Sequence, residues 1–104
     1  MKIAITSQGK TLDSKLDHRF GRTAYFIVYD TDKGTYEVSD NSLIDSGHGA
    51  GTGSAQFVAQ SCSKKIICAK FGGKAKDLLD ELGIETIAVG EIDITVQELI
   101  DQYK

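Results

Sequence analysis

Three stretches of the chain repeat apolar residues at positions i, i+3, i+4 and i+7. This spacing places apolar side chains on one face of an α-helix. The stripes therefore predict three amphipathic helices, each lying with one face on a sheet. Their members are Ala55, Val58, Ala59 and Cys62; Ala75, Leu78, Leu79 and Leu82; and Val96, Leu99, Ile100 and Tyr103.

Short apolar runs predict five strands before and between these helices. They cover Lys2–Thr6, Ala24–Asp30, Thr35–Asn41, Lys65–Ala69 and Glu85–Val89. Thr31–Gly34 is typical of a hairpin turn, Gly83 of a helix end, and Thr95 with Glu98 of a capping box. The order βββαβαβα predicts an α/β fold, with a five-stranded mixed sheet and flanking helices.

Strand direction brings four loops to one edge of the predicted sheet. A hairpin and two parallel crossovers make the first, third, fourth and fifth strands run the same way. The loops Ser7–Thr23, Asn41–Gly53, Lys70–Lys74 and Gly90–Ile94 then share the edge where open α/β sheets bind ligands. This edge gathers both histidines, His18 and His48, and the cations Lys10, Lys15, Arg19, Arg22, Lys70 and Lys74. The cations predict an anionic ligand.

Four alternating glycines, Gly47, Gly49, Gly51 and Gly53, come just before the first helical stripe. Glycine lets a ligand or another backbone approach closely, and a helix N-terminus attracts anions. The segment lacks the lysine of a P-loop and the Gly-x-Gly-x-x-Gly spacing of a dinucleotide site. Two interpretations stay open: a pocket for an anion, or close packing of the helix on the sheet.

The composition argues against several classes of protein. Of 104 residues, 40% are hydrophobic and 26% charged, which is typical of a globular protein and predicts one domain over residues 1–104. A net charge of −3 argues against a general nucleic-acid or acidic-membrane binder. No apolar run suits a signal peptide or a membrane span, so we expect a cytoplasmic protein. We expect Cys62 and Cys68 to be reduced and shielded, since free cysteine is among the most buried residue types.

The polar residues of the two long loops allow more than one chemistry. Two histidines on facing loops suit a metal or an anion, or are solvated loop residues. The arginines beside Phe20-Gly21 either clamp an anion or pair with Asp13, Asp17 or Asp45. The spacing of cysteines and histidines does not suit a zinc site. We expect no enzyme, because a nucleophile motif is missing and the first helix and the first and fourth strands carry no carboxylates for two-metal chemistry.

Several short motifs follow one another in a specific order. They are Asp17-His18-Arg19-Phe20-Gly21-Arg22, Tyr25-Phe26, an acidic hairpin, Gly49-Ala50-Gly51-x-Gly53-x-Ala55-Gln56 and Leu82-Gly83-Ile84. Together they make the chain resemble a small stand-alone member of the dinitrogenase iron–molybdenum cofactor biosynthesis family, of the NifX and NifB C-terminal type. The resemblance implies a ribonuclease-H-like fold, a role related to nitrogen fixation and non-catalytic binding of iron–sulfur or iron–molybdenum clusters.

The chain departs from the family pattern at two places. Members that handle the cofactor carry His-Phe-Gly in the first loop, and that histidine is a proposed cluster contact. Here Arg19 stands at its position and His18 lies one residue earlier. A guanidinium cannot ligate a metal, because it stays protonated. Lys70-Phe71 is the second departure, since small or polar residues are commoner there.

The sequence thus predicts a non-enzymatic binding or carrier protein for a metallocluster or its precursor, with cluster-assembly proteins as partners. The predicted metal ligands are His18 and His48. The predicted contacts to the cluster are His18, Arg19, Arg22, His48, Gly49, Gly51 and Gly53. The alternative is a binding module for a phosphorylated or other anionic small molecule at the glycine-rich loop.

Overall fold

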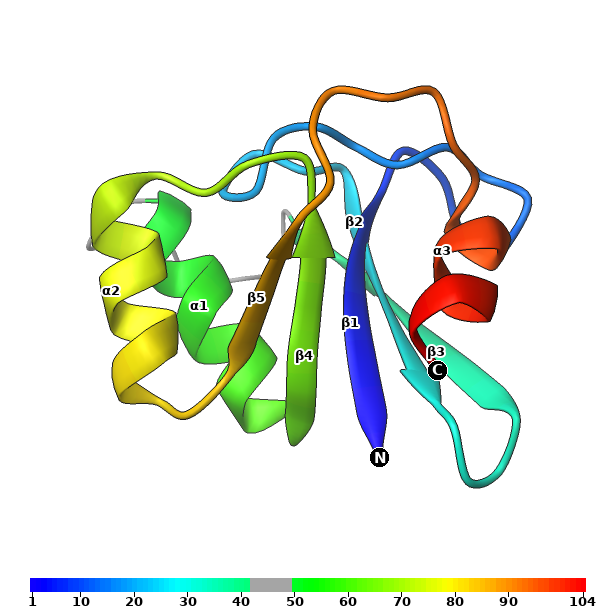
Figure 1. Ribbon diagram of the computed structural model, residues 1–104, viewed down its shortest axis with the longest axis horizontal. Coiled ribbons are helices and arrows are strands. Elements are labelled where there is room, and N and C mark those ends of the chain that lie inside the picture. The colour runs from blue at the N-terminus through cyan, green and yellow to red at the C-terminus, as the bar shows by residue number, and fades with distance from the viewer. Residues whose placement is uncertain (42–49) are drawn as a thin grey trace.

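A five-stranded mixed sheet with the strand order β3-β2-β1-β4-β5 forms the centre of the fold (Figure 1). The computed structural model describes residues 1–41 and 50–104, with the backbone alone for residues 50–52. The strands are β1 Lys2–Ser7, β2 Tyr25–Asp30, β3 Thr35–Asp40, β4 Ser63–Cys68 and β5 Glu85–Ala88. β2 pairs antiparallel with β1 and β3, whereas β4 and β5 run parallel to β1. The predicted mixed sheet and strand directions are confirmed.

Helices cover both faces of the sheet. α1 (Ala50–Gln60) and α2 (Gly73–Glu81) lie on one face, and α3 (Val96–Tyr103) lies on the other (Figure 1). The central strand β1 serves both layers, because alternate side chains of a strand point to opposite faces. Ala4 packs with the α1 and α2 layer, whereas Ile3 and Ile5 pack with the α3 layer.

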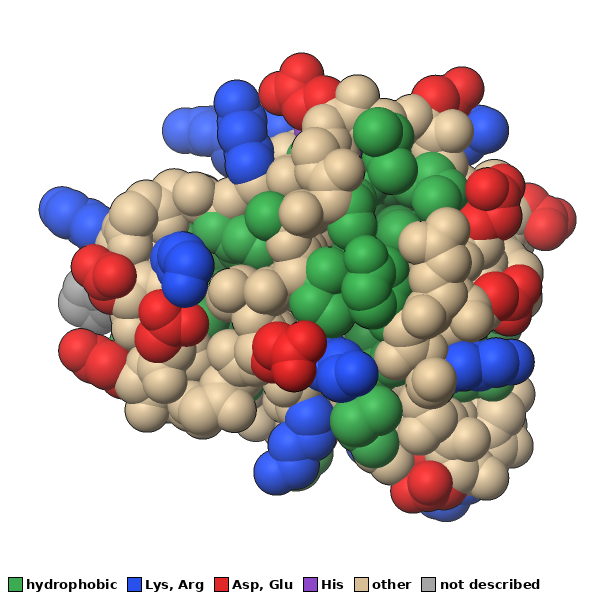
Figure 2. All heavy atoms as spheres, viewed as in Figure 1, with side chains coloured by type: hydrophobic (Ala, Val, Ile, Leu, Met, Phe, Trp, Pro, Cys, Tyr) green, Lys and Arg blue, Asp and Glu red, His purple; other side chains and the backbone are tan. Residues whose placement is uncertain are grey.

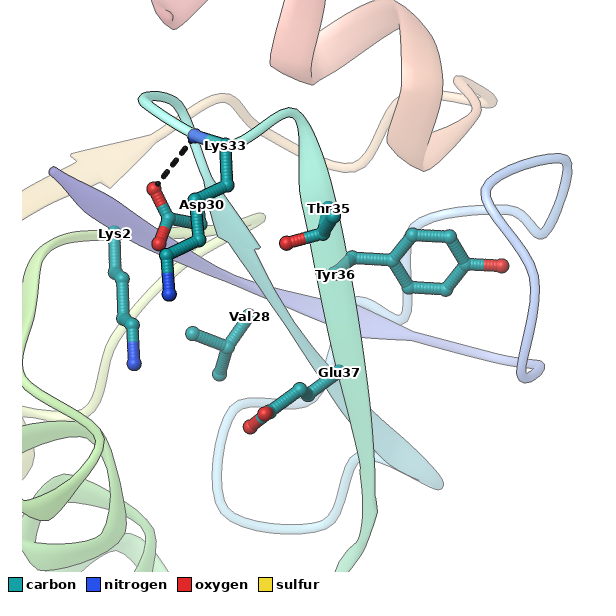
Figure 3. Close-up of a pocket in the computed structure, with 7 residues that line it drawn as sticks. All are labelled: Lys2, Val28, Asp30, Lys33, Thr35, Tyr36 and Glu37. Carbon is teal, nitrogen blue, oxygen red and sulfur yellow. Dashed lines mark hydrogen bonds between the residues drawn. The ribbon is translucent and has the colours of Figure 1, made fainter.

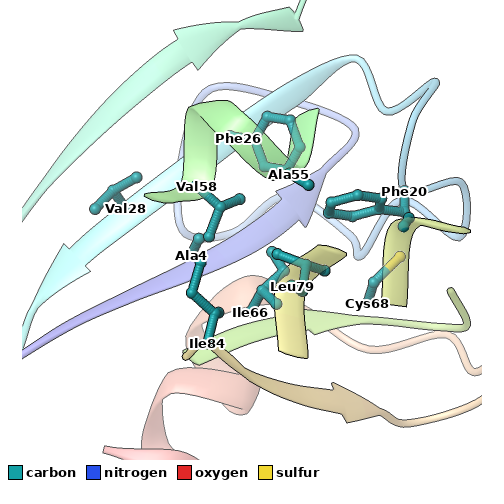
Figure 4. Packing of buried hydrophobic residues seen from close by; sticks show 11 residues of the cluster. Ala4, Phe20, Phe26, Val28, Ala55, Val58, Ile66, Cys68, Leu79 and Ile84 are labelled. Atoms are coloured by element: carbon teal, nitrogen blue, oxygen red, sulfur yellow. The ribbon is translucent and has the colours of Figure 1, made fainter. Parts of the chain in front are cut away.

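Two apolar clusters fill the space between these layers. The cluster beneath α1 and α2 includes a phenylalanine from the first loop as well as residues of the strands and helices (Figure 4). Its buried members are Ala4, Phe20, Phe26, Val28, Ala55, Val58, Ile66, Cys68, Ala75, Leu79 and Ile84. Beneath α3 lie Ile3, Ile5, Leu16, Ile27, Ile67, Ala69, Ile94, Val96, Leu99 and Ile100. The central strands β1 and β4 are therefore largely buried, as the helical stripes predict, whereas the edge strand β3 is exposed or half-buried.

The predicted ends of two helices agree with the structure. The Thr95 hydroxyl accepts a hydrogen bond from the Glu98 amide at 3.2 Å, which caps the start of α3. Gly83 follows α2 with a left-handed φ of +75°, and the amide of Ile84 donates to the carbonyl of Leu79. Leu82 departs from the predicted stripe: α2 ends at Glu81, and Leu82 is 43% exposed.

The boundaries of α1 differ from the predicted ones. The helix begins at Ala50, so Gly51 and Gly53 belong to its first turns and not to the preceding loop. It ends at Gln60, and the Ser61 hydroxyl donates to the Val58 carbonyl of the last turn at 2.6 Å. The next residue, Cys62, takes a left-handed φ of +63°, which turns its side chain away from the helical stripe. The expectation that Cys62 is shielded is therefore wrong, because its side chain is exposed; Cys68 is buried as expected, and both thiols are free.

Replacing Cys62 with glycine is expected to raise the free energy of unfolding by about 0.5 kcal/mol, because glycine relieves left-handed strain but adds freedom to the unfolded chain. The matched control is Gly83→Ala, which introduces that strain after α2. A Cβ at Gly83 would meet no atom within 4 Å, so the backbone alone sets the cost of about 1 kcal/mol. Urea denaturation of the two variants measures both changes. If both variants changed the free energy of unfolding in the same direction, left-handed strain would not explain the two turns.

Candidate functional site

The loop between β1 and β2 lies across the carboxyl ends of the neighbouring strands. The amide of Asp17 donates to the Thr6 carbonyl at 3.1 Å, and the amide of Leu16 donates to the Ile94 carbonyl at 2.8 Å. A parallel bridge joins Arg19 to Lys70 in the loop that follows β4. Three of the four loops predicted to share this edge are thus brought together by backbone pairing.

The start of α1 is tied to the same loop through Asn41. The Asn41 side-chain amide donates to the Gly21 carbonyl at 3.1 Å, and its oxygen accepts from the Ser54 hydroxyl at 3.4 Å. Gly53 is buried beside Ser54 in the first turns of α1. The predictions for His48 and Gly49 lie outside the described residues, and Gly51 is described only as helical backbone.

Asp17 is the buried anchor of this loop. Its side chain is 4% exposed, and its carboxylate accepts hydrogen bonds from the backbone amides of Arg19 and Ala24, both at 3.0 Å. The Arg19 guanidinium adds two more, from Nε to Oδ1 and from Nη2 to Oδ2, both at 3.1 Å. Burial raises the pKa of Asp17, but these hydrogen bonds outweigh it and hold the pKa below its ordinary value of 3.8.

The two arginines of the loop have different surroundings. Arg19 pairs with Asp17, one of the three acids that the sequence offered, while its side chain stays 65% exposed. Arg22 is exposed and makes no ion pair within residues 1–41 and 53–104. Part of Arg19 is therefore committed to the fold, whereas Arg22 presents its charge at the surface.

The imidazole of His18 is held by the loop between β5 and α3. Its Nε2 lies 2.9 Å from the carbonyl oxygen of Ile92. A carbonyl only accepts hydrogen bonds, so Nε2 carries a proton, and in the neutral ring Nδ1 keeps its lone pair. His18 thus has the arrangement of a metal-ligating histidine, in which one ring nitrogen donates to a carbonyl and the other is free to ligate.

Two of the predicted cations are paired with carboxylates of the loop between β5 and α3. Lys15 lies 3.4 Å from Asp93, and Lys70 lies 3.4 Å from Glu91. Basic and acidic side chains accordingly stand side by side along the upper edge of the molecule (Figure 2). The edge is less positive than the sequence predicts, because Glu91 and Asp93 reach it from the β5–α3 loop.

Aromatic packing ties the loop to the core. The Phe20 ring, 5% exposed, lies 5.9 Å from the Phe26 ring and 5.3 Å from the Phe71 ring, measured between centroids. Phe71, a departure from the family pattern, is therefore part of the packing that supports the loop. The sequence predicted no role for Phe20 beyond its place in the motif, although a phenylalanine between two cations in a polar loop is a usable sign of an anchor.

The described side chains do not assemble a chelating site. Within residues 1–41 and 53–104, no three His, Cys, Asp or Glu side chains gather in a way that could hold a metal ion. Burial raises the pKa of the Cys68 thiol, which keeps it protonated, and its Sγ lies 3.7 Å from the Asp17 carbonyl oxygen. The chemistry of the described loops therefore suits an anion held by charge and hydrogen bonds, with one imidazole nitrogen as a ligand.

A small cavity of about 70 Å³ lies at the opposite edge, beside the β2–β3 hairpin (Figure 3). The two lysines and two carboxylates of its lining balance in charge, and the Asp30 carboxylate is occupied by the amides of Asp32 and Lys33. The Lys33 amide in particular holds the pKa of Asp30 below its ordinary value. This cavity is a weaker candidate for an anion than the first loop. Its lining residues are Lys2, Val28, Asp30, Lys33, Thr35, Tyr36 and Glu37.

The fold and this edge define an α/β protein with a loop-built, cation-bearing surface at the carboxyl ends of its strands. A family model for the dinitrogenase iron–molybdenum cofactor matches residues 1–104, and the chain belongs to this family. An uncharacterised protein of Methanocaldococcus jannaschii is 31% identical over 88 residues, which cover 82% of this chain and 71% of that protein.

Two solved structures are similar to this chain in both fold and sequence. The apo form of the orange protein from Desulfovibrio gigas has a TM-score of 0.87 and 33% identity, covering 98% of this chain and 85% of that one. A candidate NifB protein from Thermotoga has a TM-score of 0.81 and 35% identity, with the same coverage. Among the residues described here, no helix has the length and apolar character needed to cross a membrane.

Proposed function

We propose that this protein binds and carries an anionic metallocluster of the iron–sulfur or iron–molybdenum type, or its precursor, at the carboxyl edge of its sheet. The observation that carries the proposal is the first loop, where the Nδ1 of His18 and the exposed charge of Arg22 lie in one short segment; among the described residues no hydrogen bond occupies that nitrogen. Family membership supports a cluster as the ligand. The protein would act in the cytoplasm and pass its cargo to cluster-assembly proteins.

Clusters built from metal and sulfide are commonly anionic, so they suit this edge as cargo. Arg22, the free edge of Arg19 and the backbone of the loop would supply charge and hydrogen bonds, and His18 would supply a nitrogen ligand. His48, Gly49, Gly51 and Gly53 enter the proposal from the sequence, as contacts from the glycine-rich segment.

The proposed role is binding without catalysis. Among residues 1–41 and 53–104, Asp17 is the one buried carboxylate, and its oxygens accept hydrogen bonds from N–H groups of its own loop. Two-metal hydrolysis needs several carboxylates that are free to hold metal ions. Metal-dependent turnover that persists through purification and responds to a variant of His18 or Arg22 would contradict this part of the proposal.

The second candidate is a binding module for a phosphorylated or other anionic small molecule at the glycine-rich loop. It is favoured by the lack of a chelating group of side chains within the described residues. Protein purified without oxygen separates the two candidates through its absorbance spectrum and its content of iron, molybdenum and sulfide. Cluster absorbance with matching metal content supports the first candidate, whereas a colourless protein that titrates with phosphate but not with a cluster donor supports the second.

The variant Arg19→His is expected to strengthen cluster binding about tenfold. A histidine here would offer one ring nitrogen to the metal while Asp17 accepts the N–H of the other, an arrangement that raises the basicity of a ligand. Anaerobic titration with an iron–sulfur or iron–molybdenum donor, followed by absorbance, measures the change. His48→Ala is expected to weaken binding in the same assay. Unchanged titrations for both variants would show that the site is wrongly assigned.

A further inference from the structure

The buried carboxylate of Asp17 is unexpected in a site for an anion. Its negative charge lies at the edge where the ligand is proposed to bind, and burying it carries a desolvation cost. Coulomb's law alone says that this carboxylate repels an anionic ligand. The hydrogen bonds within the loop offset the cost of burial, and the contact of Asp17 with Arg19 indicates a role in ligand binding as well.

Asp17 holds the guanidinium of Arg19 from one side. Nε and Nη2 each lie 3.1 Å from a different carboxylate oxygen, so the two planar groups meet along a shared edge. This pairing uses two of the five N–H groups of a guanidinium and fixes the plane of the rest. The remaining N–H groups of Nη1 and Nη2 include a parallel pair, which matches two adjacent acceptor atoms of a tetrahedral anion.

Asp17 is itself fixed to the end of the sheet. Its carbonyl oxygen accepts a hydrogen bond from the Thr6 hydroxyl at 2.6 Å, and its amide donates to the Thr6 carbonyl at 3.1 Å. The Cys68 thiol, at the end of β4, lies 3.7 Å from the same carbonyl oxygen. The guanidinium of Arg19 is therefore attached through Asp17 to the ends of two central strands.

We propose that Asp17 is a positioning residue for anion binding: it holds Arg19 by one edge so that the other edge takes two oxygen or sulfur atoms of a tetrahedral oxo- or thioanion. The inference rests on the proposed function and narrows its ligand to anions with paired acceptor atoms. Arg19 contributes through its orientation, since two of its five N–H groups and much of its charge are already matched by Asp17.

The two roles of Asp17 predict opposite signs for one substitution. If its charge only repels the ligand, Asp17→Asn strengthens anion binding. If it positions Arg19, the same substitution weakens binding. Asparagine has an NH2 group in place of one carboxylate oxygen, so it cannot accept from Nε and Nη2 on two separate atoms, and the guanidinium loses its fixed plane. The carboxylates of Glu91 and Asp93 provide controls, since they lie at the same edge but are 60% and 85% exposed and pair with lysines.

The test measures the affinity of the full chain for molybdate, a tetrahedral dianion, by calorimetry under conditions in which circular dichroism shows each variant to be folded. Asp17→Asn is expected to weaken binding about tenfold, while Glu91→Gln and Asp93→Asn leave it unchanged or slightly stronger. In an Arg19→Ala background, Asp17→Asn should no longer weaken binding, which a merely structural role of Asp17 would not predict. Arg19→Lys keeps the charge without the planar fork and tests the same idea if Asp17→Asn is poorly folded; it too should weaken molybdate binding.

Three results would overturn the inference: equal or tighter binding by Asp17→Asn, a loss that persists in the Arg19→Ala background, or a wild-type protein that does not bind molybdate. Iodide, which has one acceptor atom, should bind more weakly than molybdate and should lose no affinity in Asp17→Asn; an equal loss for both anions would count against the paired-acceptor geometry. Failure of the proposed function is read separately, in the cluster titration. If the protein takes up a cluster yet fails these tests, the proposed function stands and the positioning role of Asp17 is wrong.

Discussion

Replacing Asp17 with alanine is expected to lower the free energy of unfolding by about 3 kcal/mol, because the loss leaves several N–H groups without their acceptor. Its carboxylate satisfies the amides of Arg19 and Ala24 and one edge of a guanidinium, and its side chain is 4% exposed. Alanine removes these bonds and leaves a cavity beneath the loop. Urea denaturation measures the change.

The matched control is Asp93→Ala. Asp93 is 85% exposed and lies 3.4 Å from Lys15, so its loss should cost less than about 0.5 kcal/mol. A similar small cost for Asp17→Ala would mean that its hydrogen bonds are exchanged for water without loss, and the loop would then not depend on this residue.

The same carboxylate gives stability a dependence on acid. The pKa of Asp17 in the folded protein lies below 3.8, its ordinary value, so the folded state favours the ionised form. Its contribution is therefore fully present above pH 3.8 and is lost as the pH falls through the lower folded value. Asp17→Asn should flatten the fall in unfolding free energy in that acidic range, while stability above pH 5 changes by a constant amount. An unchanged acid profile would contradict the direction of this pKa shift.

Phe20→Ala is expected to cost about 3 kcal/mol of unfolding free energy and to weaken ligand binding as well. The ring is 5% exposed and packs against Phe26 and Phe71, so alanine leaves a cavity in the cluster beneath α1 and α2. The loop that carries His18 and Arg19 would then lose its apolar anchor. Thermal and urea unfolding, with the molybdate titration, measure the two effects.

The variant Phe20→Leu tests whether the cavity left by alanine causes both the loss of stability and the loss of binding. Leucine fills much of the cavity, so it should recover about half of the stability and most of the binding. Tyr36→Ala is the second control, because Tyr36 is 40% exposed on β3, and its removal should leave ligand binding unchanged. Normal binding by Phe20→Ala would show that the loop keeps its shape without the anchor.

The architecture follows from the sequence because burial on each face leaves a periodic record. Leu79, Leu99 and Ile100 are fully buried at positions that the helical stripes marked. Strand direction then fixed which loops share an edge, and the bridge between Arg19 and Lys70 confirms the meeting of two of them. The apolar pattern predicts helix ends less well. Cys62 and Leu82 continue the apolar spacing, although α1 and α2 have already ended before them.

The hydrogen-bond and ion-pair partners in the candidate site were harder to predict from the sequence than the fold. The sequence left open whether the arginines clamp an anion or pair with Asp13, Asp17 or Asp45. The structure pairs Arg19 with the buried Asp17, whereas Asp45 lies outside the described residues. The bond from His18 to the carbonyl of Ile92 spans 74 residues and involves a backbone atom, which no residue type records. Contacts between loops are set by the shape of the whole edge, so they become visible only in three dimensions.

The central claim is that the ligand binds at the carboxyl edge of the sheet. The backbone amide signals in nuclear magnetic resonance spectra of the protein test this claim most directly. Stepwise anaerobic addition of an iron–sulfur or iron–molybdenum donor should shift or broaden the signals of residues 17–24, 70–74 and 90–94, with those of the β2–β3 hairpin at residues 31–34 unchanged. Perturbations confined to the hairpin or to the turn at residues 61–63, or no perturbation at an equimolar amount of donor, would contradict the claim.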